Sequence, residues 1–236
     1  MIAIENEAII EEYFQYLQAK PFPCIAAKAA LAHNHIKCMV ADHIACPKDD
    51  RAMISFLYNF VDEYRASSTP YHSAAIIFRE PHQLTEELFE TFFWHRLQSL
   101  SDIDAQHYPY DTRVDKDPSS SNFSFSIKQE GFFIIGLHPG SSRLARSFKY
   151  PTIVFNPHAE FEKLRRNGRY DQMKETVRKR DMDFSGSVNP TLKDFGEVSE
   201  VFQYSGRQHS AEWKCPLMIS HAPGQKYQEK AATSKQ

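Results

Sequence analysis

Apolar residues recur at the spacing of an amphipathic helix in three segments of the first hundred residues. Residues 4–18 place five apolar side chains on one side of such a helix: Ile9, Ile10, Tyr13, Phe14 and Leu17. This helix is expected to end before Pro21 and Pro23, because proline disfavours helical geometry in the residue that precedes it. Residues 48–65 and 85–100 repeat the spacing and predict two further helices.

The longest predicted helix lies in the second half of the chain, from residue 158 to about residue 181. Gly168 falls inside it and predicts an irregularity, because glycine is a weak helix former. Five residues on one face of this helix are expected to point inward: Phe161, Leu164, Tyr170, Met173 and Val177.

Short apolar runs bounded by turn residues predict the strands. Residues 73–78 (SAAIIF) are typical of a buried strand, and residues 36–40 and 151–156 are predicted strands as well. Residues 123–128 (FSFSIK) and 132–137 (FFIIGL), separated by Gln-Glu-Gly, predict a β-hairpin. The first arm alternates Phe with Ser and is expected to bury one face and expose the other. The second arm is almost continuously apolar and is expected to be central in its sheet.

Together these elements predict an α/β (α+β) fold, in which helices flank a mixed, partly antiparallel sheet. The polar stretch at residues 111–122 is expected to be a surface connection rather than a domain boundary. Beyond residue 184 the periodicity fades into a long irregular C-terminal segment, and long structured loops commonly carry function. We therefore predict a single domain over residues 1–222, followed by a flexible tail at residues 223–236.

Composition and charge exclude several classes of protein. A formal net charge of −2 gives no general attraction to nucleic acid or to an anionic membrane. The acidic N-terminus does not resemble a secretory signal, and no run approaches the roughly 18 apolar residues that a membrane-spanning helix needs. We therefore expect a cytoplasmic protein, in which four cysteines are free thiols or ligands: Cys24, Cys38, Cys46 and Cys215.

Two clusters of polar residues offer other chemistry. Eight basic residues between 163 and 180 could contact RNA, but acidic residues interrupt them and no recognition module accompanies them, so no nucleic-acid partner is predicted. The segment 33–46 contains five residues of metal-binding type: His33, His35, Cys38, His43 and Cys46. Their spacing is looser than that of structural zinc sites, and a strand at 36–40 would point neighbours to opposite faces. A metal-dependent enzyme that uses this segment stays as an alternative.

Most of the chain resembles a known family. Residues 123–181 read FSFSIKQEGFFIIGLHPGSSRLARSFKYPTIVFNPHAEFEKLRRNGRYDQMKETVRKRD, and GSVNP, FGEVSEVFQYSGR and WKCPL follow them. These motifs, with PFPCIAAKAAL near the N-terminus, are similar to the YqcI/YcgG family. That family includes haem-dependent enzymes that hydroxylate guanidine nitrogens, notably the N-hydroxylase of the guanitoxin pathway. The resemblance therefore implies haem b (iron protoporphyrin IX) as the cofactor and a monooxygenase activity.

Given this resemblance, His138 is the first choice for the axial ligand of the haem iron. It follows an apolar strand and precedes a Pro-Gly turn, so a rigid element would present its imidazole to a cavity. The alternatives are His158 at a helix N-terminus and Cys215, whose thiolate would push electron density onto the iron. Arg143 and Arg146 would pair with the haem propionates, unless they form an ordinary solvated surface.

The polar residues of the segment GEVSEVFQYSGR are the candidates for catalysis and substrate binding. Glu197 or Glu200 would orient a guanidinium or amine nitrogen, with Tyr204 close by. Arg207 would bind the carboxylate of an amino-acid-like substrate. Hydrogen bonding within a loop is the structural alternative for these side chains.

These residues predict a haem-dependent N-hydroxylase that acts on a small guanidino or amino compound. Its electrons would come from an external donor, because no flavin or nicotinamide fingerprint is present. The alternative is a non-enzymatic haem-binding or sensing protein, which would use the same histidine. The sequence is also compatible with a homo-oligomer. The prediction requires a cavity for the porphyrin at the turn that follows residues 132–137.

Overall fold

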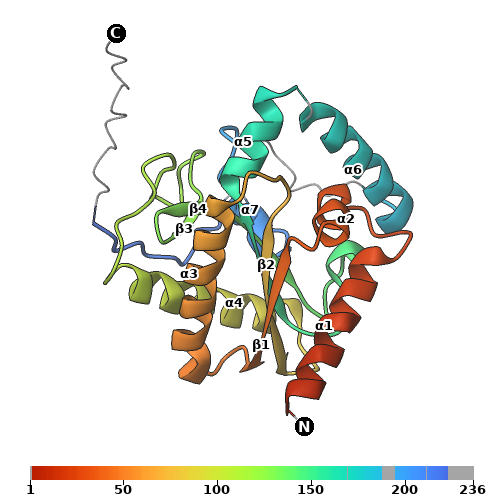
Figure 1. Cartoon of the computed structure of the whole chain (residues 1–236), viewed down its shortest axis with the longest axis horizontal. Helices are drawn as coiled ribbons and strands as arrows, with labels where there is room; N and C mark the ends of the chain where they lie inside the picture. Colours follow the sequence, from red (N-terminus) through yellow and green to blue (C-terminus); the bar gives the residue numbers. More distant parts are fainter. Residues whose placement is uncertain (1, 169, 188–194, 211, 223–236) are drawn as a thin grey trace.

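The computed structural model describes residues 2–168, 170–187, 195–210 and 212–222 (Figure 1). Its elements are, in chain order, α1 (Ile2–Gln18), α2 (Ile25–Ala32), β1 (Ile36–His43), η1 (Pro47–Asp49), α3 (Asp50–Ala66), β2 (Ser73–Glu80), α4 (Glu86–Asp104), β3 (Phe125–Ile127), β4 (Glu130–Leu137), η2 (Leu144–Arg146), β5 (Thr152–Pro157), α5 (His158–Arg166), α6 (Tyr170–Ser185) and α7 (Val201–Tyr204). The tail predicted at residues 223–236 lies outside the described residues.

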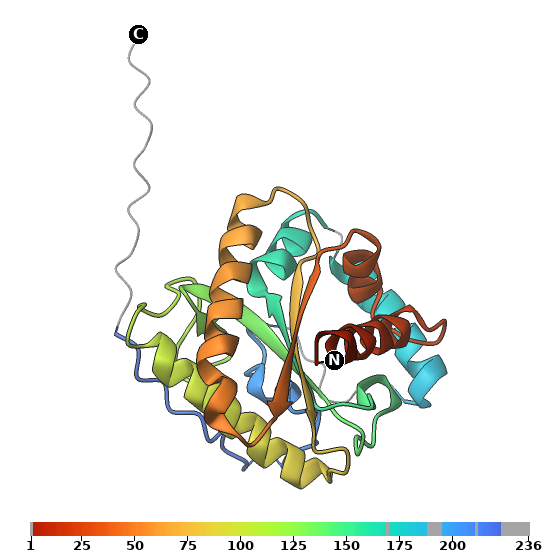
Figure 2. The same cartoon turned by 60° about the horizontal axis from the view of Figure 1, so that its bottom comes forward.

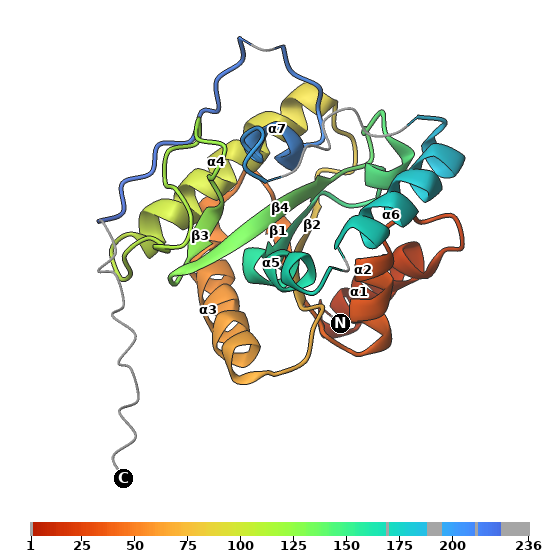
Figure 3. The same ribbon diagram turned by 90° about the horizontal axis from the view of Figure 1, so that it is seen from above.

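The predicted α/β fold is confirmed. The described strands form one five-stranded sheet in the order β1-β2-β5-β4-β3. The β1–β2 pair is parallel and the other pairs are antiparallel, so the sheet is mixed. Helices cover both of its faces: α3 and α4 lie on one side, and α1, α2 and α6 on the other (Figures 2 and 3).

Two hydrophobic clusters form the core, one on each face of the sheet. The larger lies under α3 and α4 and includes Leu57, Phe78, Phe89, Phe93 and Phe155. The smaller lies under α1 and α2 and includes Tyr13, Leu17, Ile36, Ile77 and Val154. Because both faces are covered, the central strands are mostly apolar, and Ser73 to Phe78 of β2 are all buried.

The hairpin differs from the sequence-based expectation in two details. Its turn is Lys128-Gln129, where both residues have positive φ (51° and 58°), and Glu130 already pairs with Ile127. Positive φ at both central residues is typical of a two-residue hairpin turn. The expected exposed face of the first arm is wrong, because Ser124 and Ser126 are both fully buried. Other loops cover them and supply hydrogen-bond partners, such as the backbone N–H of Asp111 for Ser126 (3.1 Å).

The predicted long helix is two helices. α5 ends at Arg166, α6 begins at Tyr170, and Gly168 between them has a φ of +67°. Glycine adopts this left-handed conformation without steric cost, so the expected irregularity is a complete break. The Ala-rich helix α2 was not predicted, because its eight residues are too short for an amphipathic pattern to show.

The irregular segment after α7 runs along α4 on the side away from α1 and α2 (Figure 3). Gln98 of α4 exchanges two hydrogen bonds with the backbone of Met218 (2.8 and 2.9 Å). His221 Nε2 lies 2.9 Å from Asp104 Oδ2, at the end of the same helix. None of the helices in the described parts of the chain combines the length and the apolar character needed to cross a membrane.

Candidate functional site

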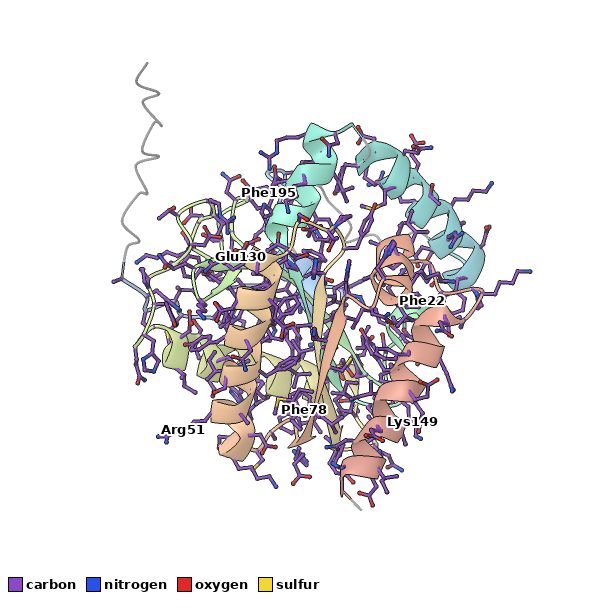
Figure 4. The ribbon with its side chains drawn as sticks, viewed as in Figure 1. Phe22, Arg51, Phe78, Glu130, Lys149 and Phe195 are labelled. Atoms are coloured by element: carbon purple, nitrogen blue, oxygen red, sulfur yellow. The ribbon has the colours of Figure 1, made fainter. Side chains whose placement is uncertain are left out.

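A cavity of about 270 Å³ lies between the sheet and the helices α1, α2, α5 and α6. Its volume is close to the lower end of the range of about 300–1,000 Å³ that is usual for ligand pockets. The sheet contributes the apolar residues Phe133, Ile135, Leu137 and Val154. Two further phenylalanines line the cavity. Phe22 belongs to the connection from α1 to α2, and Phe195 lies beside α5 (Figure 4).

Helices α5 and α6 run in different directions (Figure 1), and both contribute residues to the cavity wall. Their break near Gly168 lets both helices turn an apolar side toward the same space. The five inward residues predicted for this region all line the cavity: Phe161, Leu164, Tyr170, Met173 and Val177. The helical periodicity of residues 158–181 therefore predicted the wall of the cavity, although not the break that shapes it.

Cys24 is the thiol in the cavity wall. It caps the N-terminus of α2, and its Sγ accepts a hydrogen bond from the backbone N–H of Ala27 (3.5 Å). Burial raises the pKa of the thiol, while the backbone N–H groups of Ala27 and Ala26 act in the opposite direction. Sequence reasoning did not single out Cys24. The signal was its place between Pro23 and an Ala-rich segment, a position suited to a helix cap.

Among the described residues that line the cavity, His72 is the one histidine. Its ring stacks on that of His35 with centroids 4.4 Å apart. Its Nε2 lies 3.1 Å from Ser67 Oγ and 3.2 Å from Thr69 Oγ1. Burial, followed by the neighbouring His35, lowers the pKa of His72, so its imidazole is neutral at pH 7.

Glu200 brings a carboxylate to the cavity and is itself buried. Its Oε2 accepts a hydrogen bond from Ser124 Oγ (2.7 Å) and lies 3.1 Å from the hydroxyl of Tyr204. His158 Nδ1 lies 3.6 Å from the other carboxylate oxygen. Burial, with a smaller contribution from Glu200, raises the pKa of Tyr204 well above its usual range, so the phenol keeps its proton. The structure thus brings together Glu200, Tyr204 and His158 from the predicted site.

His138 is not among the described residues that line the cavity. Successive side chains of a strand point to opposite faces, so Leu137 faces the cavity while His138 stacks on Phe89 of α4 with centroids 4.1 Å apart. Burial lowers the pKa of His138 from 6.5 to about 4. The cavity does reach the loop after β4, at Arg143 and Arg146, but this geometry does not support His138 as an iron ligand.

The two alternative iron ligands also lie outside the cavity lining. His158 is buried, with its Nδ1 3.2 Å from Ser124 Oγ and its ring against Phe195. Cys215 is partly buried on the other face of the sheet, where it packs against the larger core cluster, and burial raises the pKa of its thiol to about 12. These three residues, which the sequence offered as alternatives for one ligand, lie in different parts of the structure.

Arg143 and Arg146 line the cavity, but their guanidinium groups have partners within the protein. Arg143 Nη2 lies 2.6 Å from Asp181 Oδ2 of α6. Arg146 donates to three carbonyl oxygens, those of Gly136 (3.2 Å), Gln203 (2.8 Å) and Tyr204 (3.1 Å). Burial lowers the pKa of Arg146 to about 10. Both arginines therefore hold α6 and α7 in place around the cavity.

Glu197 and Arg207 do not reach the cavity lining. Glu197 is exposed. Arg207 pairs with Glu90 (3.0 Å) and Glu87 (3.3 Å) on α4. Helix α7 lies between Glu200 and Arg207, whereas Glu197 precedes Glu200 in the chain and points to the surface. The segment predicted as one polar site is therefore divided between two places.

The segment 33–46 does not form a metal site. Among the described residues, no group of three His, Cys, Asp or Glu side chains is arranged to hold a metal ion. Cys38 packs in the smaller core cluster, whereas the ring of His43 contacts Phe92 of α4 on the opposite face. Strand alternation separates these residues, and the alternative of a metal-dependent enzyme in this segment is not supported.

Comparisons with known proteins agree on one family. The model of the YqcI/YcgG family matches residues 13–218. The chain is similar to two proteins of Bacillus subtilis (strain 168). It is 25% identical over 215 residues to Uncharacterized protein YqcI, covering 85% of this chain and 79% of YqcI. It is 28% identical over 212 residues to Uncharacterized protein YcgG, covering 84% of this chain and 81% of YcgG.

No solved structure is significantly similar. Because the family model covers most of the sequence, the chain belongs to the YqcI/YcgG family.

Proposed function

We propose that this chain binds haem b in the cavity and uses it to hydroxylate a guanidine or amine nitrogen of a small amino-acid-like compound. The observation that carries the proposal is the cavity itself, whose walls are apolar and whose lining includes one thiol and several cationic side chains. A porphyrin is flat and apolar and ends in two carboxylates, so this combination suits it. Haem-dependent N-hydroxylases within the same family support the activity.

Cys24 replaces His138 as the residue that would hold the haem iron. Haem iron needs one such donor, and the wall offers the sulfur of Cys24, with the backbone N–H groups of Ala26 and Ala27 placed to stabilise a thiolate. The thiol is protonated when nothing is bound to it, and a coordinating metal removes that proton. When bound, a thiolate-ligated haem supplies the activation of dioxygen, which no side chain can perform.

Glu200 is the residue proposed to orient the substrate nitrogen. Its carboxylate lies in the cavity wall, and Ser124 and Tyr204 hold it through hydrogen bonds to one oxygen. A guanidinium or ammonium group would donate a charge-assisted hydrogen bond to this carboxylate. Such a bond is stronger beside apolar walls than in open water. The electrons would come from an external donor.

The test of haem binding is a titration of the purified apoprotein with haemin, followed by the Soret band. We expect one equivalent to bind, and Cys24→Ser to shift the Soret maximum and to weaken binding by at least about tenfold, because a metal–thiolate bond is lost. Cys215→Ser is the matched control and should leave the spectrum unchanged. A wild-type protein without a Soret band contradicts haem binding, and an unchanged spectrum in Cys24→Ser contradicts the ligand assignment.

The test of the activity is substrate-dependent oxygen consumption by the haem-loaded protein with an external reductant, with the N-hydroxylated product identified by mass spectrometry. Glu200→Gln should lower the rate by about 10- to 100-fold, the value of one charge-assisted hydrogen bond. Glu197→Gln, at an exposed position, should have no effect. A haem complex that consumes no oxygen with any guanidino or amino compound would instead indicate a non-enzymatic haem-binding protein.

A further inference from the structure

The cationic side chains of the cavity differ in whether they have hydrogen-bond or ion-pair partners within the protein. Five of them line it: Arg143, Arg146, Arg165, Lys174 and Arg178. Arg143 and Arg146 bind Asp181 and three backbone carbonyls as described above. Arg165 forms an ion pair with Glu162, and Lys174 Nζ lies 3.4 Å from Asp171 Oδ1. Four of the five cations therefore have a partner that belongs to the chain.

Arg178 is the exception among these five. It lies on α6, on the same helix face as Lys174, and its guanidinium has neither an ion pair nor a hydrogen bond with any described residue. Its Nε is buried and has no acceptor. Buried N–H donors are almost always satisfied in native proteins, and one that is not often marks the place of a bound group.

None of the described acidic residues of the cavity lining makes a contact with Arg178, and each is held by another partner. Asp181 binds Arg143, and Glu160 binds the backbone N–H of Tyr71 (2.8 Å) and Lys163 (3.2 Å). Glu200 is held by Ser124 and Tyr204. The buried Nε of Arg178 is therefore left available to an acceptor on a molecule bound in the cavity. A guanidinium is matched best by a carboxylate, to which it donates two parallel hydrogen bonds.

We propose that Arg178 is the carboxylate-binding residue of the cavity and that the molecule bound there presents a carboxylate to it. This inference rests on the proposed function and deepens it. Two carboxylates are compatible with the geometry, a propionate of the haem and the α-carboxylate of an amino-acid-like substrate. In both cases Arg178 takes the role that the sequence had assigned to Arg143, Arg146 and Arg207.

The experiment measures dissociation constants for two pairs of ligands that differ only in the carboxylate. One pair is metal-free protoporphyrin IX and its dimethyl ester, followed by porphyrin fluorescence. The other is L-arginine and agmatine, followed by calorimetry. The metal-free porphyrin needs no axial ligand, so its binding does not depend on Cys24. We expect the wild-type protein to prefer the carboxylate member of at least one pair by about tenfold or more.

Arg178→Gln should abolish this preference, and Arg178→Lys should retain part of it, because lysine keeps the charge but not the bidentate geometry. Arg180→Gln is the matched control, since it removes the same charge from an exposed position of the same helix and should keep the preference. Circular dichroism of each variant verifies that it is folded. Loss of the preference in the porphyrin pair identifies a propionate, and loss in the arginine pair identifies the substrate carboxylate.

Two results overturn the inference: a wild-type protein with no preference in either pair, or a preference that survives in Arg178→Gln. The proposed function fails in a different way, through the absence of a Soret band in the wild-type protein. If Arg178→Gln still binds haem and still prefers the carboxylate ligand, the proposed function is kept and the role of Arg178 is contradicted. Conversely, if the protein binds no haem but prefers L-arginine over agmatine through Arg178, the inference is kept and haem binding is contradicted.

Discussion

At the scale of single residues, the direction of each side chain decides what it can do. Leu137 and His138 are neighbours in the chain, yet one faces the cavity and the other packs against Phe89 on the opposite side of the sheet. His138 is 2% exposed and its Nδ1 has no hydrogen-bond partner. A buried, neutral imidazole of this kind serves packing, and it makes the stability of the protein depend on pH.

His138 is expected to destabilise the protein in acid. Its pKa is about 4 in the folded state against 6.5 for a free histidine, because burial, with Arg146 adding to it and Glu86 opposing it, disfavours the charged ring. Between these two values the unfolded chain binds more protons than the folded one. The free energy of unfolding should therefore fall as the pH decreases from about 6.5 to about 4, by up to about 3 kcal/mol.

Urea unfolding near pH 7.5 and near pH 4.5 measures this effect. His138→Phe keeps a flat ring against Phe89 and cannot titrate, so its stability should fall less between the two pH values than that of the wild-type protein. Exposed His82→Phe is the control and should follow the wild type. An equal pH dependence in His138→Phe and the wild type would show that this imidazole does not carry the effect.

At the scale of secondary-structure elements, a buried charge ties the helices of one face together. Arg96 of α4 is 2% exposed, donates to the carbonyl of Ile44 through Nε (3.1 Å) and Nη2 (2.9 Å), and forms an ion pair with Asp50 of α3. Neither charge can return to water while the helices are packed. The pair therefore matters most when one partner is removed.

Arg96→Leu should lower the free energy of unfolding by about 3–5 kcal/mol, because it leaves the carboxylate of Asp50 buried without its cation. The double variant Arg96→Leu with Asp50→Leu should recover part of this loss. Arg51→Leu is the control, since Arg51 projects from the surface of α3 (Figure 4) and should change stability by less than about 0.5 kcal/mol. Chemical denaturation measures all three, and a cost of Arg96→Leu no larger than that of Arg51→Leu would contradict the argument.

At the scale of the whole molecule, the irregular C-terminal segment is tied to α4 and to the loop that follows it. Its residue His221 and Asp104 of α4 form a pair whose side chains are both fully buried. Asp104 also accepts the backbone N–H of Lys128 at the hairpin turn (3.0 Å), and the ring of Tyr110 packs against His221. One carboxylate thus joins α4, the hairpin and a segment more than a hundred residues away.

His221→Ala should cost about 3 kcal/mol, because it creates a cavity and leaves Asp104 with an unsatisfied buried oxygen. Met218→Ala, in the same segment but 76% exposed, is the control and should have little effect. Thermal unfolding provides the measurement, and near-UV circular dichroism reports whether Tyr110 and its surroundings are still packed. Equal melting temperatures for the two variants would mean that the segment is not tied down through His221.

Much of the secondary structure could be predicted from the chain, because the signals are local. The strand at residues 73–78, the helix that follows Thr85 and the second arm of the hairpin depend on apolar runs and caps within a few residues. The inward-facing residues of 158–181 could likewise be predicted from their helical spacing. By contrast, the burial of Ser124 and Ser126 could not be predicted, since their partners Glu200 and Asp111 come from distant parts of the chain.

The candidate site was only partly predictable for the same reason. Glu200 and Tyr204 were identified because they form a dense polar group in an irregular segment, and they do meet in the structure. Cys24 and Arg178 were missed, because nothing in the sequence near them shows that α2 and α6 close over the same face of the sheet. His138 was chosen for its place at a strand end, which does not specify which face its ring will reach.

The sequence by itself determined the family, through its motifs. It also determined most of the helices and strands and the apolar faces that they bury, because periodicity and turn chemistry act over a few neighbouring residues. Only the tertiary structure decided which residues share the cavity. Adjacent side chains of a strand point to opposite faces, so a site depends on which helices cover each face. Those helices, α2 and α6, are separated by more than a hundred residues in the chain and lie next to each other only in the folded structure.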